Sequence, residues 1–326
     1  MPLTLPPILK RFALPLVLVV FLVFPFVASD YAVNVAYFFG IYVLLGLSLN
    51  IVLGEVGLYD LGHAAYYAIG AYATAILSTR LGIPVLLLLP VSAIAAGLFA
   101  YAVTSPIIHL RGDYLCIVTI GIGEIVRLAL INNPFDWTGG PNGVYGIATP
   151  TLGFLAIDSS LGYYLLVWIV VAITIVGLQR LQRSRIGRAW NCIREDEVAA
   201  QATGINVRSH KLLAFVLGAA LAGVAGSLYA TKLMVVSPAS FTFWDSCLMF
   251  SIVLIGGMGS IPGVVIGAAA ITLFPELFRS FVNYRMVVFG LAMILMMMFR
   301  PGGLWPRRRG GTEARDLIQR LWRRDA

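Results

Sequence analysis

Ten apolar stretches alternate with short polar or glycine-rich connections, at residues 12–28, 31–53, 58–79, 83–105, 114–131, 161–179, 212–235, 247–258, 262–278 and 284–299. A helix needs roughly 20 apolar residues to cross the hydrocarbon core of a membrane. The pattern therefore predicts an all-α fold, a polytopic transmembrane helical bundle of about 8–10 spans. Some of these segments are expected to be broken or re-entrant.

Two stretches contain features that interrupt a helix. Residues 58–79 carry Asp60 and His63 among many glycines and alanines, and residues 256–263 are too rich in glycine for a continuous helix facing lipid. Irregular backbone within a membrane must face protein or a watery path. Residues 51–57 also resemble residues 252–259. Transporters often contain paired repeats of glycine-interrupted helices, and apolar glycine-rich segments also resemble one another by chance.

The composition excludes a soluble enzyme and a disordered chain, because 60% of the 326 residues are hydrophobic and only 12% are charged. The formal net charge of +8 could indicate a nucleic-acid partner, but the basic residues are sorted along the chain. Residues 180–211 hold seven basic residues and the tail 300–326 holds eight, whereas residues 132–160 hold none. Cytoplasmic segments of membrane proteins are enriched in Lys and Arg. We therefore expect both termini in the cytoplasm, anionic membrane lipid near the tail, and no nucleic-acid partner.

Three arginines, Arg80, Arg279 and Arg285, do not fit this sidedness. The stretch 12–28 follows Lys10 and Arg11 and lacks a small-residue cleavage site, so we interpret it as a retained helix, with a cleaved signal peptide as the alternative.

Catalytic signatures are missing from the sequence. It contains no HExxH, G-x-S-x-G or GxxxxGK[ST] motif. Its three histidines and three cysteines lack metal-site spacing. We expect no enzyme activity, no metal and no cofactor in this chain, so a gradient or another subunit must supply energy for any transport.

The segment 184–206 is the most informative polar region. Residues 194–203 favour a helix that Gly204 would end. Val198, Ala199 and Ala202 would form a small apolar face on it. This is either a solvated loop helix or a docking helix that fits a groove on a soluble partner.

Glu197-Val198-Ala199-Ala200 followed by Gly204-Ile205 resembles the EAA loop of ABC importer permeases, although Val198 is inserted after the glutamate. Five further motifs occur in order: GLYDLGH at 57–63, RGDYL at 111–115, GEIVR at 123–127, TGGPNG at 138–143 and IGGMGS at 255–260. Together they resemble the LivM-type permeases of branched-chain amino acid ABC transporters over roughly residues 30–300. The resemblance divides the chain into an N-terminal helix (1–30), a permease domain (31–300, with a coupling loop at 180–211) and a basic cytoplasmic tail (301–326).

The resemblance implies a subunit of the bacterial inner membrane that works by alternating access. Its implied partners are a second, LivH-like permease, two ATP-binding cassette subunits that hydrolyse ATP, and an extracytoplasmic substrate-binding protein. Related chains are expected to include importers of urea, amides and aromatic acids as well. The residues implied in coupling to the ATPases are Arg194, Glu195, Glu197, Ala199, Ala200, Gly204 and Ile205.

Charged groups inside a membrane usually face a cavity or a partner. Glu124 and Arg127 have the spacing of an ion pair on one helix face, with direct substrate contact as the alternative. Asp60 and His63 share that spacing beside Gly62. They either line the substrate path or belong to a region where small residues allow close helix packing. The complete set of substrate-path candidates is Asp60, His63, Gly70, Glu124, Arg127, Gly256 and Gly257.

The loop at Thr138, Gly139, Gly140, Asn142 and Gly143 is interpreted as a structural turn, with contact to the binding protein as the alternative.

Two other classes of protein are considered. A secondary transporter would couple Asp60, Glu124 or Glu276 to protons, and would continue to transport after ATP depletion. A membrane-embedded transferase would need a catalytic constellation near one interface, and we find none in the sequence.

Overall fold

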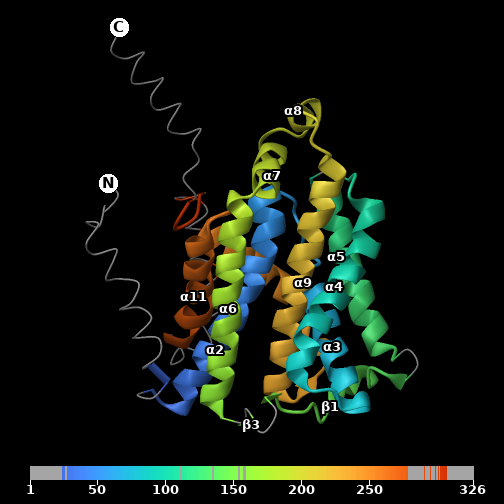
Figure 1. Ribbon diagram of the computed structural model, residues 1–326, viewed down its shortest axis with the longest axis vertical. Coiled ribbons are helices and arrows are strands. Elements are labelled where there is room, and N and C mark those ends of the chain that lie inside the picture. The colour runs from blue at the N-terminus through green and yellow to red at the C-terminus, as the bar shows by residue number, and fades with distance from the viewer. Residues whose placement is uncertain are drawn as a thin grey trace.

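The computed structural model describes residues 24–25, 28–110, 112–133, 136–152, 155–156, 159–277, 290, 294, 298, 300 and 302–306. Long, roughly parallel helices form a bundle with two distinct ends (Figure 1). Six of the described helical segments are long and apolar enough to cross a membrane: Asp30–Val56, Val85–Ile107, Asp113–Ile131, Ser160–Arg183, Val207–Leu233 and Pro238–Gly256. The predicted fold class, a polytopic helical bundle, is confirmed.

The elements follow the chain as α2 (Asp30–Leu49), the π-helix η1 (Asn50–Val56), α3 (Ala64–Leu81), α4 (Val85–Ile107), α5 (Asp113–Ile131), the 3-10 helix η3 (Gly140–Asn142), β1 (Val144–Tyr145), β2 (Thr151–Leu152), β3 (Leu155–Ala156), α6 (Ser160–Arg183), α7 (Arg185–Glu195), α8 (Glu197–Ala202), α9 (Val207–Leu233), β4 (Val235–Val236), η4 (Pro238–Ser240), α10 (Phe243–Gly256) and α11 (Ile261–Leu277). The predicted stretches 12–28 and 284–299 and the tail 301–326 lie mostly outside the described residues, as do Arg279 and Arg285.

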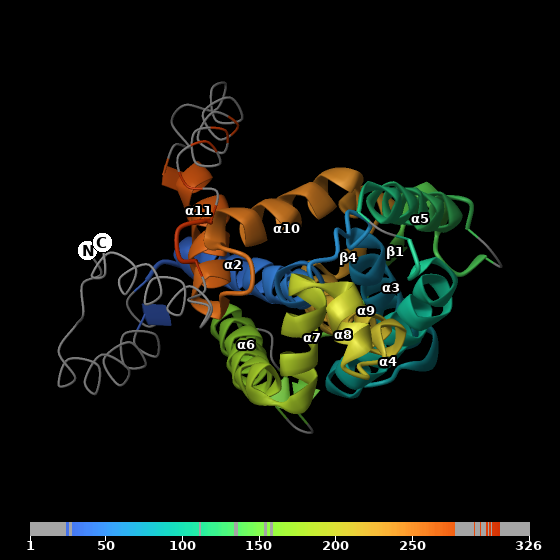
Figure 2. The same ribbon diagram turned by 90° about the horizontal axis from the view of Figure 1, so that it is seen from above.

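Helix α9 lies at the centre of the bundle against α2, α3 and α4 (Figure 2). Glycines allow this close approach. A Cβ at Gly223 would lie 2.6 Å from the carbonyl oxygen of Ser92, and a Cβ at Gly226 would lie 2.2 Å from that of Tyr67. Small residues let helix backbones pack closely where no hydrophobic effect drives helices together.

The predicted interruption near Asp60 is real. The helix formed by α2 and η1 ends at Gly57, whose φ of +83° is a left-handed conformation that glycine adopts at little cost. Residues 58–63 are not helical, and α3 begins only at Ala64. The predicted break near Gly257 is also real, because α10 ends at Gly256 and α11 begins at Ile261.

The second break is covered by protein, as its glycine content predicts. The backbone N–H groups of Leu304 and Trp305 donate to the carbonyl oxygens of Ile255 (2.8 Å) and Gly256 (3.0 Å). The short segment 302–306 therefore closes the end of α10.

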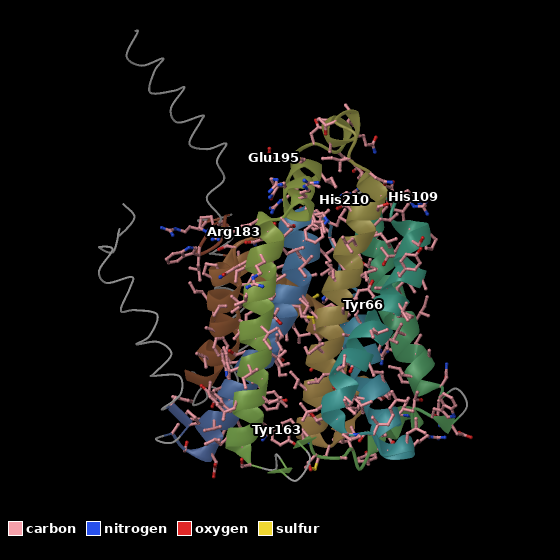
Figure 3. The ribbon with its side chains drawn as sticks, viewed as in Figure 1. Tyr66, His109, Tyr163, Arg183, Glu195 and His210 are labelled. Atoms are coloured by element: carbon pink, nitrogen blue, oxygen red, sulfur yellow. The ribbon has the colours of Figure 1, made fainter. Side chains whose placement is uncertain are left out.

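The two ends of the bundle differ. Helices α7 and α8 project from one end, where Arg183, Glu195 and His210 also lie (Figure 3). The pairs β1–β4 and β2–β3 and the side chain of Tyr163 lie at the opposite end (Figures 1 and 3). Arg80, which fitted the predicted sidedness poorly, donates from Nη2 to the carbonyl oxygen of Asp136 (2.5 Å), and its guanidinium lies 5.8 Å from the ring centre of Trp137.

Candidate functional site

The candidate coupling segment is two short helices rather than one. A single helix over 194–203 was predicted, and this is wrong, because Asp196 has the extended conformation φ −155°, ψ 114° between α7 and α8. The Asp196 carboxylate accepts from the backbone N–H of Val198 (2.8 Å) and of Ala199 (3.0 Å). Such a cap begins a new helix. The predicted stop at Gly204 is confirmed, since its φ is +84° and α8 ends just before it.

Helix α8 presents small apolar side chains outward. Val198 is 66% exposed, and Ala199 and Ala202 are exposed beside it. Ala200 is instead buried, at 2% exposure, because it lies on the side of the short helix that packs on the bundle. The predicted apolar face of Val198, Ala199 and Ala202 is therefore exposed, whereas Ala200, also a predicted coupling residue, is not available on that face.

Several of the predicted coupling residues hold α7 and α8 on the bundle. Glu197 accepts from Lys211 Nζ at 2.7 Å, and Lys211 is only 4% exposed. Arg194 donates through Nη1 to the carbonyl oxygen of Gly54, within η1. Glu195 and Gly204 are exposed, and Ile205 is half-buried against the core. The contact of any of these residues with an ATPase stays a prediction.

The π-helix η1 joins α7 to the second break. Its Glu55 accepts from Gln182 Nε2 at 2.6 Å, near the end of α6. Its Asn50 is 2% exposed and accepts from the backbone N–H of Gly259 at 2.9 Å. Short π-helical segments are frequent at functional sites. Here the segment is bonded both to the base of the projecting helices and to the break between α10 and α11.

Asp60 and His63 form a closed network with Ser48. Asp60 Oδ2 lies 2.9 Å from His63 Nδ1, and Ser48 Oγ lies 2.8 Å from His63 Nε2. Asp60 Oδ1 accepts from the N–H of Gly62 at 3.0 Å. All three side chains are 0% exposed. The order Ser–His–Asp matches that of hydrolytic triads, yet complete burial keeps any substrate from Ser48 in this conformation. The network instead ties the end of α2 to the start of α3.

Glu124 and Arg127 form the predicted ion pair on α5. Arg127 Nε lies 2.9 Å from Glu124 Oε1 and 3.0 Å from Oε2, and Nη2 also contacts Oε1. The side chains are 43% and 29% exposed, respectively. In the described part of the chain no hydrogen bond or ion pair joins them to Asp60 or His63, although α5 contacts that break through Thr119, whose Oγ1 accepts from the N–H of Leu61 at 3.2 Å.

The glycine candidates lie at tight backbone contacts. A Cβ at Gly70 would lie 2.2 Å from the carbonyl oxygen of Gly223 in α9. A Cβ at Gly256 would lie 2.2 Å from that of Gly263, and one at Gly257 would lie 2.8 Å from that of Trp305. These contacts explain the glycines by close packing. A role in lining the substrate path stays a prediction for all seven candidates.

The loop after α5 is a compact turn. Asn133 Oδ1 accepts from the N–H groups of Thr138 (2.9 Å) and Gly139 (3.0 Å), and Thr138 is 5% exposed. Gly140 is also buried, whereas Gly139 and Asn142 are exposed. A Cβ at Gly143 would lie 2.0 Å from the carbonyl oxygen of Val236 in β4. The structural interpretation of this turn holds, and contact with a binding protein stays a prediction.

Sequence reasoning missed Ser48, Asn50 and Lys211, and it assigned no role to Glu55. The available signal was a polar side chain within an apolar helical stretch, because a buried polar group needs a hydrogen-bond partner. Within the described part of the chain, no group of three or more His, Cys, Asp or Glu side chains could hold a metal ion.

A family model described as "Branched-chain amino acid transport system / permease component" matches residues 31–297. The chain is 39% identical, over 92% of its length and 76% of the relative, to the high-affinity branched-chain amino acid transport system permease protein LivM of Escherichia coli K12. It is 30% identical to the high-affinity branched-chain amino acid transport system permease protein BraD of Pseudomonas aeruginosa (82% and 92% coverage) and 27% identical to LivH of Escherichia coli K12 (82% and 91%).

No solved structure matches the chain. The matched family model spans almost all of the described bundle, and the relatives include both LivM and LivH permease proteins. The chain therefore belongs to the family of permease components of branched-chain amino acid transport systems.

Proposed function

We propose that this chain is one of two permease subunits of an ATP-binding cassette importer for branched-chain amino acids. Its partners would be a LivH-like permease, two ATPase subunits and an extracytoplasmic substrate-binding protein. The chain would hold no ATP site of its own and would lie in a bacterial inner membrane with both termini in the cytoplasm. The basic residues near α7 and α8 support this orientation, because positive charge favours the cytoplasmic side.

One observation carries the proposal: α8 projects from the basic end of the bundle with Val198, Ala199 and Ala202 exposed. A short helix with small side chains can enter a groove on a partner and approach its backbone closely. Two contacts, Lys211 with Glu197 and Arg194 with the carbonyl oxygen of Gly54, attach α7 and α8 to the bundle.

The hydrogen bonds that attach α7 and α8 to the bundle would transmit a movement of the ATPases to the membrane-spanning helices. A push on α8 would reach α7, and Arg194 on α7 bonds the carbonyl oxygen of Gly54 in η1. Asn50 in η1 then bonds Gly259 at the break between α10 and α11. Because each link is a direct hydrogen bond, closure of the ATPases would shift α2 and α10 together and so alternate access to the path between the permeases.

The exposed side of α5 supports a second permease subunit. Glu124 and Arg127 are partly exposed within a span, alongside Ile117 (65% exposed) and Ile125 (66% exposed). An ion pair facing hydrocarbon is costly, and such groups usually face a protein or a watery cavity. We therefore place the companion permease, or the watery path that the two subunits share, against this side of α5.

Two matched variants test the docking role of α8. Val198 and Tyr145 have nearly equal exposure, 66% and 65%, and lie at opposite ends of the bundle. We expect Val198→Arg to abolish co-purification of the ATPase subunits, because a large charge would not enter an apolar groove. Tyr145→Arg should leave co-purification unchanged, and membrane insertion should be the same for both.

Retention of the ATPases by Val198→Arg would overturn the docking role of α8.

A separate measurement tests the energy source. Uptake of radiolabelled leucine into proteoliposomes that hold the assembled complex should require ATP inside the vesicle and resist an uncoupler. Uptake that survives ATP depletion and collapses with the uncoupler would instead show a secondary transporter.

A further inference from the structure

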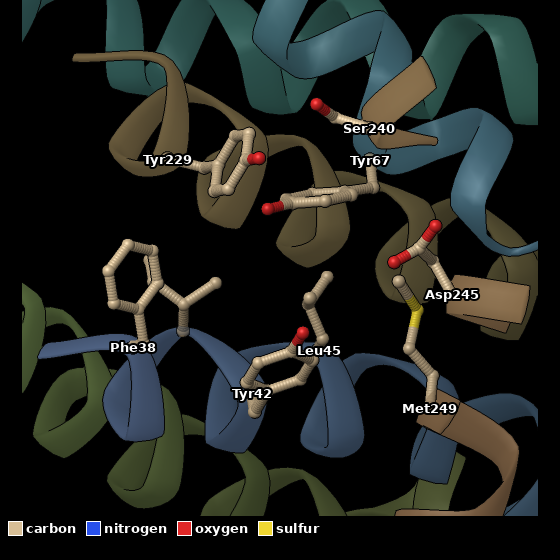
Figure 4. Close-up of a pocket in the computed structure, with 9 residues that line it drawn as sticks. Phe38, Tyr42, Leu45, Tyr67, Tyr229, Ser240, Asp245 and Met249 are labelled. Carbon is tan, nitrogen blue, oxygen red and sulfur yellow. The ribbon is translucent and has the colours of Figure 1, made fainter. Parts of the chain in front are cut away.

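A cavity lies between α2, α3, α9 and the start of α10 (Figure 4). Phe38, Ile41, Leu45 and Met249 form an apolar side, and hydroxyl and carboxylate groups form the rest: Tyr42, Tyr67, Tyr229, Ser240 and Asp245. Most of the lining residues belong to segments long and apolar enough to cross a membrane, the part of a transporter in which substrate sites lie.

Polar groups point into this cavity without protein partners. In Figure 4 the hydroxyls of Tyr42 and Tyr67 are directed toward the open space. Tyr67 is only 5% exposed, and in the described part of the chain neither hydroxyl hydrogen-bonds to another protein group. Both hydroxyls are therefore free to bond a ligand or water inside the cavity.

Packing holds the aromatic wall in place. The ring of Tyr67 lies 5.5 Å from that of Tyr229 and 5.0 Å from that of Phe241, measured between ring centres. The contact with Phe241 is edge-on and that with Tyr229 is tilted, and aromatic contacts of this length are favourable. The Tyr67 hydroxyl is thus presented by a ring packed on two sides, as a preformed binding site requires.

Asp245 supplies a charge to the same cavity. Its Oδ2 accepts from the backbone N–H of Thr242 (2.8 Å) and from the Thr242 hydroxyl (2.7 Å). Both donors are neutral, and no cationic side chain pairs with Asp245 among the residues that the structure describes. No donor in that part of the chain reaches Oδ1. A carboxylate at this depth favours a cationic ligand group.

We propose that this cavity is a substrate subsite for a zwitterionic amino acid with an aliphatic side chain. Asp245 would bind the α-ammonium group, and the hydroxyls of Tyr42 and Tyr67 would donate to the α-carboxylate. The side chain would lie against Leu45 and Met249. This inference rests on the proposed function, since it names the place that the transported amino acid occupies.

The test uses the complete transporter in proteoliposomes with leucine-loaded binding protein at saturating concentration. Asp245→Asn retains the size of the side chain and an oxygen that can cap α10, and removes only the charge. We expect leucine uptake to fall about tenfold or more, because a hydrogen bond between charged groups is lost. ATP hydrolysis stimulated by the binding protein should remain, since α8 and its anchors are untouched.

Thr242→Ala is the matched control, because it removes the capping hydroxyl and leaves the charge of Asp245 in place. Its uptake should equal that of the parent. Tyr67→Phe should reduce uptake by several-fold through loss of a single hydroxyl, with ATP hydrolysis unchanged.

Parental uptake by Asp245→Asn would overturn the subsite, and so would an equal loss in Thr242→Ala, which would make Asp245 only a helix cap. Failure of the proposed function would appear differently: the parent complex itself would then take up no leucine with ATP. The two results are therefore distinguishable in one set of vesicles.

Discussion

The two breaks in the helices follow similar glycine-containing motifs, yet they are stabilised in different ways. At residues 57–63, buried side chains hydrogen-bond to one another, and Ser48, Asp60 and His63 are all 0% exposed. At the second break, backbone and side chain both contribute: the N–H groups of Leu304 and Trp305 donate to the carbonyl oxygens of Ile255 and Gly256, and Asn50 Oδ1 accepts from the N–H of Gly259. Gly257 and Gly259 are buried, whereas the covering residues Leu304 and Trp305 are 40% and 57% exposed.

This difference follows from the surroundings. A break deep in the bundle cannot be hydrated, so its polar groups must be paired within the protein. A break near the end of the bundle can be closed by a passing segment of chain. The breaks are also joined, since Asn50 accepts from Gly259 and so links η1 to the second break. Similar sequence motifs thus produce one break held by a buried side-chain clamp of Ser48, His63 and Asp60, and one break covered by the backbone of residues 302–306.

The largest loss of stability should come from breaking the Ser48–His63–Asp60 network at the first break. Asp60→Ala would leave His63 Nδ1 and the N–H of Gly62 without their partner in a fully buried site. We expect a loss of about 3 kcal/mol or more in the free energy of unfolding, because a buried polar network is broken on one side. The melting temperature of the detergent-purified chain would measure it. Asp60→Asn, which retains an acceptor for Gly62, should lose less, and an unchanged melting temperature for Asp60→Ala would remove the distinction between the breaks.

Replacing a tightly packed glycine by alanine should cause an intermediate loss of stability at either break. A Cβ at Gly62 would lie 2.0 Å from the carbonyl oxygen of Thr119, and one at Gly256 would lie 2.2 Å from that of Gly263. Gly62→Ala and Gly256→Ala should each cost about 1–3 kcal/mol, because backbone must move to admit the methyl group. Chemical unfolding curves would measure the loss. Gly121→Ala is the control, since nothing lies within 4 Å of its Cβ position, and equal stability of all three variants would contradict the packing role.

The smallest loss of stability should come from weakening the segment 302–306, which covers the second break. Trp305→Pro would remove the N–H that donates to Gly256, at a cost of about 0.5–1.5 kcal/mol. Trp305→Ala keeps that N–H and serves as the control. Thermal unfolding of both variants would separate the backbone bond from the indole side chain. A loss from Trp305→Pro as large as that from Asp60→Ala would show that the second break is as rigid as the first.

Some of the site was predictable from sequence. The spacing of Glu124 and Arg127 predicted their ion pair, and Gly204 predicted the end of α8. The burial of Ala200 was not predictable, because the side of a six-residue helix that packs on the bundle depends on where Asp196 starts it. Asp245 was missed for a related reason: its position near Tyr67 and Tyr229 arises from three elements far apart in the chain.

Hydropathy and the placement of Lys and Arg were sufficient for the helical class, the approximate spans and the expected sidedness, because lipid restricts what may cross a membrane. They also located both breaks, since glycine and buried charge are costly in a lipid-facing helix. Only the tertiary structure decided which polar side chains meet. Ser48 with His63, Asn50 with Gly259 and Arg194 with Gly54 are contacts between distant segments, and long-range packing of the helices brings these groups within hydrogen-bond distance.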